Sequence, residues 1–492
     1  MARRSEERPN IAATGTIFLS SLFTGLGMTI TATPNLKLYE SVLCCQKLEE
    51  QCRLGDFVDV ASCKDQSKPE LDVQADLAAL TSTMSSVGAV GVLITALCLK
   101  FLKIRSSSQT VLLSRFLTFV ILIAQQAIAW TNGNIPLQLM YGTSLLMAAV
   151  GITCSILFKS FIPELIPQSQ LSFIMFLIFT FEAQFSSFLG DYLVGHYLDE
   201  SSFEMCIYIG LGCHLAGILS LLRLRWLATP NVDAFPNADD PDERTFSRWV
   251  TILICLPAVV YNPITFTYST IARQYLGVQF KLDMGKTSAV FADANLPILV
   301  LVTIVSGIFF IKTWYFHSPP LEAAGSPPSS PPPSSTCSVK KDVILSAIFL
   351  VIALLGNLCL GSATDVPAFK WGLILVSLGL SFTSIIESAL AVIGGPERKI
   401  DLLLVNQLLE AFGRAVLVPV VSKLFQFGLK GRDGANGPKL VDQAIASDLL
   451  GFPIKLGPNL AFYAVALLCA AACGGLGVAL LFIAKSRRIR LE

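Results

Sequence analysis

The chain contains about twelve separate apolar stretches, each long enough to cross a lipid bilayer as a helix. A hydrocarbon core of ~30 Å requires ~20 helical residues, and in lipid only helices or closed barrels satisfy every backbone polar group. The stretches form two sets on either side of a charged connector, Pro230–Arg244. The sequence therefore predicts an all-α membrane protein with about twelve transmembrane helices in two six-helix lobes.

Hydropathy gives approximate bounds for these helices and for the segments between them. The N-terminal lobe covers residues 14–227 and the C-terminal lobe residues 247–484, joined by a connector at 228–246. Tails occupy residues 1–13 and 485–492, and the second of these is basic. The Pro/Ser-rich composition of residues 313–341 predicts a disordered loop. The expected helices lie near ~14–34, ~77–99, ~110–130, ~136–158, ~171–195, ~204–226, ~247–270, ~289–311, ~343–362, ~371–394, ~402–428 and ~459–484.

The composition excludes several classes of protein. Only 14% of residues are charged and 53% are hydrophobic, whereas soluble domains carry about 25% charged residues, so most of the surface is expected to face lipid. The net charge of +1 argues against a nucleic-acid partner. The chain has no phosphate-binding loop, no nucleophile elbow and only three scattered histidines. We therefore expect neither an enzyme nor a bound metal or other cofactor.

Lysine and arginine are more frequent on the connections that share a side with both chain ends, if the helices alternate in direction. Because such residues concentrate on the cytoplasmic side, both termini are expected to be cytoplasmic. The expected location is the plasma membrane or a vacuolar or vesicular membrane, and the expected functional unit is a monomer.

This orientation places the loop at residues ~35–76 outside the cytoplasm, where cysteines can be oxidised. The loop contains Cys44, Cys45, Cys52 and Cys63, which allow three complete pairings, and we expect at least one disulfide. A metal site is the alternative, but the loop contains no histidine and no Cys-x-x-Cys spacing.

Several short motifs occur in a characteristic order along nearly the whole chain. They read Leu43-Cys-Cys-Gln46, Cys63-Lys64, Gln74-Ala-Asp-Leu-Ala-Ala-Leu80, Arg273-Gln-Tyr-Leu-Gly-Val-Gln-Phe280, Pro396-Glu-Arg-Lys399 and Glu410-Ala-Phe-Gly413. In this order they resemble the major facilitator superfamily, in particular its divergent branch abundant in filamentous fungi. The resemblance implies a secondary transporter that works by alternating access, with its substrate held between the two lobes near mid-membrane.

One departure from that family concerns the cytoplasmic gate. The signature between helices two and three, Gly-x-x-x-Asp-Arg-x-Gly-Arg-(Lys/Arg), reads Leu99-Lys-Phe-Leu-Lys-Ile-Arg-Ser-Ser-Ser108 here. Lys103 occupies the aspartate position, Arg105 lies in the same degenerate segment, and a lysine cannot make the charge pairs of the aspartate. Either the gate uses different charge pairs, or the protein no longer cycles normally.

Ionisable residues inside membrane helices are costly, so each is a functional hypothesis. Glu410 and Arg414 share a helix face with Asn406, as a proton-sensitive group or as a structural ion pair. Tyr261 and Asn262 precede Pro263, where a kink suits a gating helix but is also common without that role. The other candidates for coupling or for lining a substrate cavity, each with packing as the alternative, are Glu182, Asp293 and Glu387.

Two functions remain open at this stage. The first is transport of a small organic molecule, with proton coupling suggested by the intramembrane carboxylates and export suggested by the family resemblance. The second is a non-transporting receptor, scaffold or decayed copy, which the degenerate gate segment and the Pro/Ser-rich loop favour. An unrelated polytopic protein would require a helix order incompatible with two sets of six.

Overall fold

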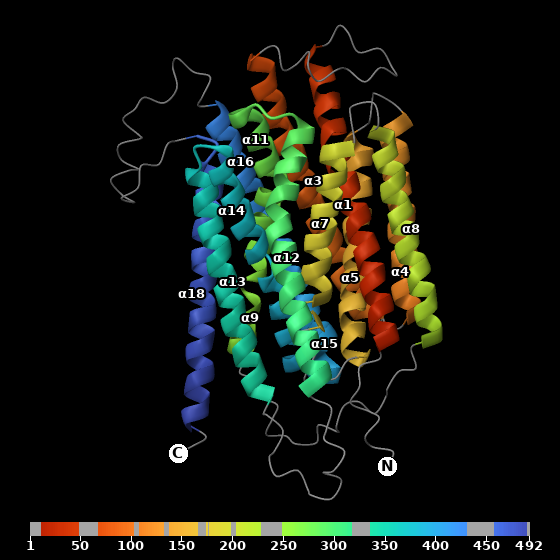
Figure 1. The fold of residues 1–492 in the computed structure, drawn as a ribbon, viewed down its shortest axis with the longest axis vertical. Helices are drawn as coiled ribbons and strands as arrows, with labels where there is room; N and C mark the ends of the chain where they lie inside the picture. The colour runs from red at the N-terminus through yellow and green to blue at the C-terminus, as the bar shows by residue number, and fades with distance from the viewer. Residues whose placement is uncertain are drawn as a thin grey trace, which may run out of the picture.

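The computed structural model describes residues 11–48, 67–102, 108–131, 137–165, 174–175, 177–197, 203–227, 248–316, 335–430 and 457–489. Every regular element within these ranges is helical, and the helices stand side by side in an elongated bundle (Figure 1). Nine candidate membrane spans in the described part are long and apolar enough to cross a bilayer. The prediction of an all-α membrane protein is confirmed, whereas the count of twelve crossings stays a prediction.

Small residues bring the helices of the N-terminal half together. A Cβ atom on Gly27 would lie 2.7 Å from the Gly210 carbonyl oxygen, so the first and last helices of this half are in backbone contact. Such close contacts are expected because lipid is as apolar as the helix surfaces and gives them no hydrophobic reason to associate. The helices are α1 (Ile11–Leu48), α3 (Ser67–Leu102), α4 (Ser108–Thr131), α5 (Leu137–Leu165), the π-helical turn η2 (Leu177–Phe181), α7 (Glu182–Tyr197) and α8 (Phe203–Leu227).

The C-terminal half contains the largest apolar core, in which the rings of Tyr275, Phe369 and Phe462 stack or meet edge to face. Its first span is interrupted, because Pro257 separates two helices and a π-helical turn follows. The elements are α9 (Arg248–Cys255), α10 (Ala258–Phe266), η5 (Thr267–Ile271), α11 (Ala272–Phe280), α12 (Met284–Phe316), α13 (Ser335–Ser362), α14 (Val366–Gly379), α15 (Phe382–Phe412), η6 (Gly413–Leu417), α16 (Val418–Lys430) and α18 (Leu460–Ile489).

Helix α15 reverses its direction within its length. The Gln407 side-chain amide donates to Glu387 Oε1 at 3.3 Å, although the two residues are 20 positions apart. On a straight helix that separation would be ~30 Å. A Cβ atom on Gly394 would lie 2.8 Å from Lys399 Cα, which places the tight reversal around Pro396. The expected helices at ~371–394 and ~402–428 therefore meet inside α15.

Helix α1 begins and α18 ends at the same end of the bundle, which we call the terminal end; the opposite end is the far end (Figure 1). Helices extend beyond several expected bounds: α1 begins at Ile11 and α18 ends at Ile489, inside the expected tails. Likewise α12 ends at Phe316 and α13 begins at Ser335, inside the expected loop. Hydropathy marks the end of the apolar part of a helix, whereas the helix itself can continue through polar residues. The expected bounds therefore differ from the helix ends in the structure.

Some sequence-based predictions fall outside the described residues. These include the connector at 228–246, Lys103 and Arg105 of the degenerate segment, and Cys52 and Cys63. Cys44 and Cys45 lie in the last turns of α1, where only the backbone is described.

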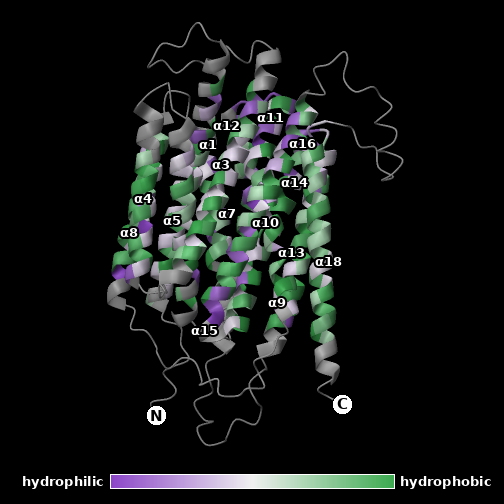
Figure 2. Cartoon of the chain, turned by 180° about the vertical axis from the view of Figure 1, so that it is seen from behind, coloured by the Kyte–Doolittle hydropathy of each residue, from purple (hydrophilic) through white to green (hydrophobic). Residues whose placement is uncertain are grey.

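Large apolar side chains cover the outward faces of the bundle (Figure 2). Leu113 and Phe116 of α4, Ile304 of α12 and Leu467 of α18 are all exposed. Apolar faces of this kind would promote aggregation in water, whereas in a bilayer they can face the apolar lipid chains. Buried polar and charged side chains instead gather inside the bundle.

We predict that Gly413→Ala destabilises the protein by about 1–3 kcal/mol, the usual cost of overpacking. The reason is that a Cβ atom at Gly413 would overlap the Val259 carbonyl oxygen of α10, and backbone cannot move aside cheaply. Thermal unfolding of the purified protein measures the loss. Gly474→Ala in α18 is the matched control, since no atom lies within 4 Å of its added methyl group. Equal effects of the two changes would contradict the prediction.

Candidate functional site

A buried ion pair joins the two halves near the terminal end. Lys159 of α5 lies 2.5 Å from Glu387 of α15, and their side chains are only 17% and 2% exposed. The Gln407 amide donates to the same carboxylate oxygen, and Lys159 Nζ also lies 5.3 Å from the Phe179 ring centroid. Each charge therefore has a partner and an apolar cover, as a buried pair requires.

Three sequence candidates meet around Glu410. The Asn406 side chain donates to Glu410 Oε1 at 3.0 Å, and the Asn262 side chain of α10 donates to the Glu410 carbonyl oxygen at 2.8 Å. Tyr261, the neighbour of Asn262, lies edge to face against Phe382 with 6.3 Å between ring centroids. The interruption at Pro257 and the polar Tyr261-Asn262 pair thus bring α10 against the start of the last π-helical turn.

Arg414 occupies that turn but is not part of this hydrogen-bonded group. Among the described residues it takes part in none of the hydrogen bonds or ion pairs, and its buried Nε has no acceptor. A Cβ atom on Gly88 of α3 would lie 3.5 Å from Arg414 Nη1, so the guanidinium reaches the other half. An α-helical spacing of four favours a pair with Glu410, but the π-helical turn that begins at Gly413 changes that spacing.

Glu182 begins α7 directly after the turn η2. Its carboxylate lies against Gly25 of α1, where a Cβ atom would overlap Oε1. Ser21, Arg115 and Lys159 are the polar and charged groups that act on it. Glu182 therefore lies within the electrostatic reach of Lys159, a member of the ion pair that joins the two halves.

Arg115 of α4 lies against an aromatic ring. In the structure its guanidinium lies 5.1 Å from the Phe158 ring centroid, and its buried Nε has no hydrogen-bond acceptor. The buried His214 Nε2 of α8 also lacks a partner and lies within the electrostatic reach of Arg115.

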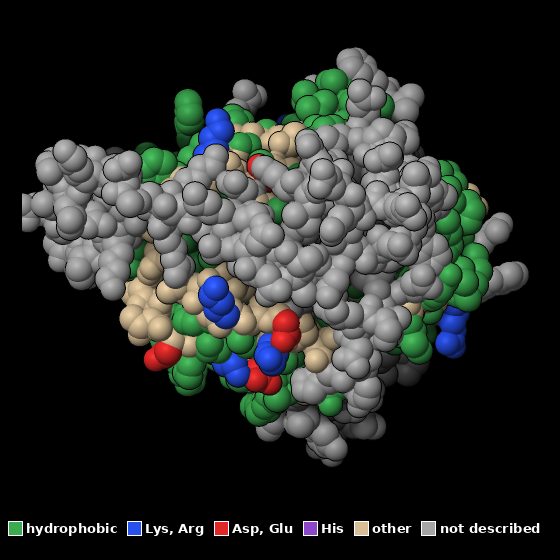
Figure 3. Space-filling model, turned by 90° about the horizontal axis from the view of Figure 1, so that it is seen from above, with side chains coloured by type: hydrophobic (Ala, Val, Ile, Leu, Met, Phe, Trp, Pro, Cys, Tyr) green, Lys and Arg blue, Asp and Glu red, His purple; other side chains and the backbone are tan. Residues whose placement is uncertain are grey.

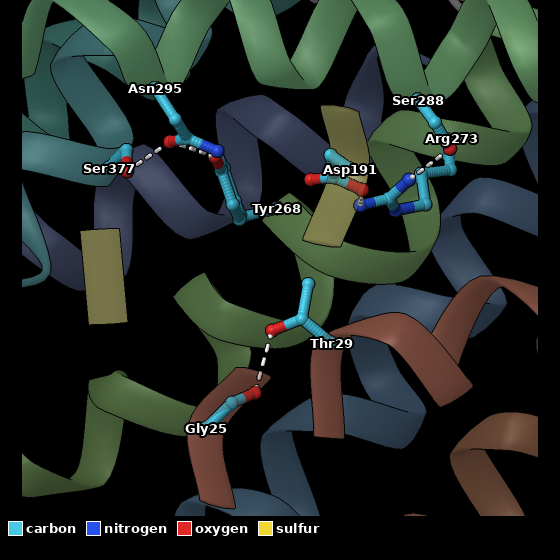
Figure 4. A network of polar contacts seen from close by, with 8 residues as sticks. All are labelled: Gly25, Thr29, Asp191, Tyr268, Arg273, Ser288, Asn295 and Ser377. Atoms are coloured by element: carbon cyan, nitrogen blue, oxygen red, sulfur yellow. Dashed lines mark hydrogen bonds and ion pairs between the residues drawn. The ribbon is translucent and has the colours of Figure 1, made fainter. Parts of the chain in front are cut away.

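A second buried ion pair joins the halves towards the far end (Figure 4). Arg273 of α11 lies 2.6 Å from Asp191 of α7, with exposed fractions of 10% and 2%. Arg273 also donates to Ser288 of α12 at 3.3 Å and lies 4.2 Å from the Phe291 ring centroid. Beside Asp191, Gly190 lets α7 approach Thr29 of α1 closely.

A neutral hydrogen-bond network lies near this pair (Figure 4). The Ser377 hydroxyl of α14 is 3.0 Å from Gln184 Oε1 of α7 and 2.9 Å from Asn295 Oδ1 of α12. The Tyr268 hydroxyl of η5 donates to the same Asn295 oxygen at 2.9 Å. The network therefore ties α7 of the first half to three elements of the second.

Asp293 lies apart from both inter-half ion pairs. It pairs with Lys370 of α14 at 2.6 Å, within the C-terminal half, and its side chain is 57% exposed. A second exposed pair, Lys286 with Asp283 at 3.1 Å, begins α12 at the far end, where basic and acidic side chains lie next to one another (Figure 3). Exposed pairs of this kind contribute little to stability.

The sequence analysis missed Lys159 and Arg273 as site residues. Lys159 follows directly after the expected helix at ~136–158, so it was not counted among the intramembrane charges. Helix α5 in fact continues to Leu165. Arg273 was noticed only as part of a motif near a helix exit. The usable signal for both was the presence of an acidic residue, Glu387 or Asp191, at similar depth in another helix.

We predict that Lys159→Met and Glu387→Gln each destabilise the protein by about 3–5 kcal/mol, the cost of leaving a buried charge unpaired. The double variant should recover most of that loss because no unpaired charge remains. Unfolding of the purified variants measures both effects, and Lys286→Gln, in an exposed pair worth about 0–1 kcal/mol, is the control. Simple additivity of the two single losses would show that the pair is not coupled.

No protein-family model matches the sequence, and no curated protein matches it. Solved structures match over nearly the whole chain. The human organic anion transporter MFSD10 (TETRAN) is 13% identical, with a TM-score of 0.54, and the match covers 96% of this chain and 100% of that one. A bacterial homologue of the iron transporter ferroportin in an outward-facing state is 12% identical, with a TM-score of 0.51 and coverage of 96% and 99%.

An auto-inhibited peptide transporter of the POT family is 10% identical, with a TM-score of 0.51 and coverage of 96% of each chain. At these identities the likeness concerns the fold, and it argues against an unrelated polytopic architecture. The chain is an integral, multi-pass membrane protein with the fold of major facilitator superfamily transporters.

Proposed function

We propose that this protein is a secondary transporter that carries a small organic molecule by alternating access. The observation that carries this proposal is the presence of one buried inter-half ion pair towards each end of the bundle, Lys159–Glu387 and Asp191–Arg273. Alternating access requires the interface between the halves to open at one end while it stays closed at the other. Ion pairs that can exchange partners suit such an interface better than a continuous apolar seam.

Lys159 has a second carboxylate available when the terminal end opens. Glu182 belongs to the same half as Lys159 and lies within its electrostatic reach, so it would remain nearby when Glu387 moves away. The exchange would keep Lys159 compensated while the halves separate. Glu387 would then be a carboxylate without a cation in a low-dielectric region, and such a group is neutralised by taking up a proton.

This exchange supports proton coupling through the carboxylates of Glu182, Glu387 and Glu410. Lys159 interacts with all three of them. We further propose that both termini are cytoplasmic, from the charge bias of the sequence, and that the direction is export, from the family resemblance. A proton gradient directed into the cytoplasm would then drive substrate out.

Proton coupling is tested in proteoliposomes that contain the purified protein and an enclosed pH-sensitive dye. We expect addition of a transported compound from a panel of small organic molecules to cause proton movement. Glu387→Gln and Glu410→Gln should reduce this proton movement at least tenfold, because neither amide can take up a proton. Asp283→Asn, in the exposed pair with Lys286, should leave it unchanged.

Proton coupling would be contradicted if transport occurs at the same rate with and without a pH gradient and is unchanged in both glutamine variants. If no compound of the panel moves, the result favours the non-transporting alternative, and the accessibility measurement that follows decides between the two.

Opening of the far end should expose Ser422 of α16. Its side chain is fully buried here and donates to the Ala78 carbonyl oxygen of α3 in the other half at 2.8 Å. We predict that Ser422→Cys reacts with a membrane-impermeant maleimide, because the halves separate there during the cycle. Cross-linking of Ala78→Cys to Ser422→Cys should prevent both that reaction and transport, and reduction should restore both. A Ser422→Cys thiol that reacts only after unfolding would indicate a single static state.

A further inference from the structure

A cation without a hydrogen-bonded or ion-paired anion among the described residues lies deep inside the bundle. Arg414 is in η6, between α15 and α16, far from either end of that span. Among the described residues it forms no hydrogen bond or ion pair, and its Nε is buried without an acceptor. A charged side chain in this position is expensive unless an opposite charge accompanies it. The donors of its guanidinium are therefore available to an added anion.

Glu410 acts on Arg414 electrostatically, but neither Glu410 nor Glu387 forms a hydrogen bond or ion pair with its guanidinium. Glu410, one turn before Arg414, accepts from Asn406 at 3.0 Å. Glu387 is paired with Lys159 and also accepts from Gln407. The guanidinium instead lies against the other half of the protein, where a Cβ atom on Gly88 of α3 would lie 3.5 Å from Nη1. The Nη1 atom of Arg414 therefore lies at the interface between the halves, which alternating access would open to an anion.

We propose that Arg414 binds the carboxylate of an organic monoanion, which is the substrate class of this protein. The inference rests on the proposed transport function. A guanidinium presents its donors in a planar fork that matches the two oxygens of a carboxylate. The Tyr261 ring, held edge to face by Phe382, lies on the neighbouring helix and offers an apolar face to the rest of the molecule.

The valence of the anion follows from the surrounding charges. Glu387 and Glu410 lie on the same side of the interface as Arg414, and both would repel an added negative charge. One guanidinium compensates a single negative charge, whereas a phosphate dianion would bring a second charge next to Glu410. The site therefore favours a monocarboxylate over a phosphate ester.

Binding is measured on the purified full-length protein in detergent, through the shift of its thermal unfolding temperature with added compound. The probes are three acids, each paired with its neutral amide: benzoate and benzamide, indole-3-acetate and indole-3-acetamide, octanoate and octanamide. We expect at least one acid to stabilise the protein at a concentration at least tenfold below that of its amide, because only the acid carries the charge that Arg414 requires.

The variants assign the effect to this residue. Arg414→Gln should weaken acid binding at least tenfold, and Arg414→Lys should weaken it less, because the lysine keeps the charge but loses the planar fork. Lys423→Gln is the matched control, since Lys423 is an exposed cation on the same span and its removal should not change acid binding. If Arg414→Gln does not fold, the Arg414→Lys variant and the acid–amide pairs still decide the question.

Three results would overturn the proposal. Acids and amides could stabilise the protein equally, no acid could bind, or acid binding could survive in Arg414→Gln. A fourth result would also overturn it: loss of ligand-free stability in Arg414→Gln that Glu410→Gln restores would assign Arg414 to an internal ion pair. Acids that bind but are not moved in proteoliposomes would refute transport and leave this site intact. Transport of neutral compounds that is unaffected by Arg414→Gln would refute the site alone.

Discussion

The pairing of buried charge is the constraint on which the interface between the two halves depends. Within the bundle an ion must have an opposite charge, a polar donor or an aromatic face beside it. Lys159 has both Glu387 and the Phe179 ring, and Arg273 has Asp191, Ser288 and the Phe291 ring. Both ion pairs cross between the halves. Each pair therefore stabilises only the relative position of the halves in which its two charges are in contact. A change in that position must supply new partners for four charges.

Departures from α-helical geometry determine where several of these charges lie. In the described chain the π-helical turns η2 and η5 come shortly before Glu182 and Arg273, and η6 contains Arg414. A π-helical turn inserts an extra residue, so every side chain beyond it rotates relative to the α-helical spacing. Gly413 allows this turn to lie directly against α10. The irregular backbone therefore sets the direction of the charged side chains along the interface.

This also explains how much the sequence could predict. Hydropathy identifies helices because lipid selects length and apolarity, but it does not give their ends, since helices such as α1, α5, α12 and α18 extend beyond the apolar stretches. Glu387, Asn406 and Glu410 are buried and Asn262 is half-buried, so polar residues whose cost in lipid is visible in the sequence do lie inside the bundle. Their roles in coupling or in a substrate cavity stay predictions. The hydrogen-bond and ion-pair partners of these residues could not be predicted, because they depend on how each helix is rotated about its axis. Four-residue spacing suggested that Arg414 pairs with Glu410, but the π-helical turn between them is not encoded in a recognisable pattern.

The same reasoning bears on the degenerate segment that contains Lys103 and Arg105. That segment lacks the aspartate of the signature to which it was compared, and it lies outside the described residues. Lys159 and Glu387 supply a buried charge pair between the halves near that end, formed by α5 and α15 rather than by the connection between α3 and α4. A gate formed by this pair does not need the aspartate. In the proposed transport cycle, this pair would take the place of the missing aspartate.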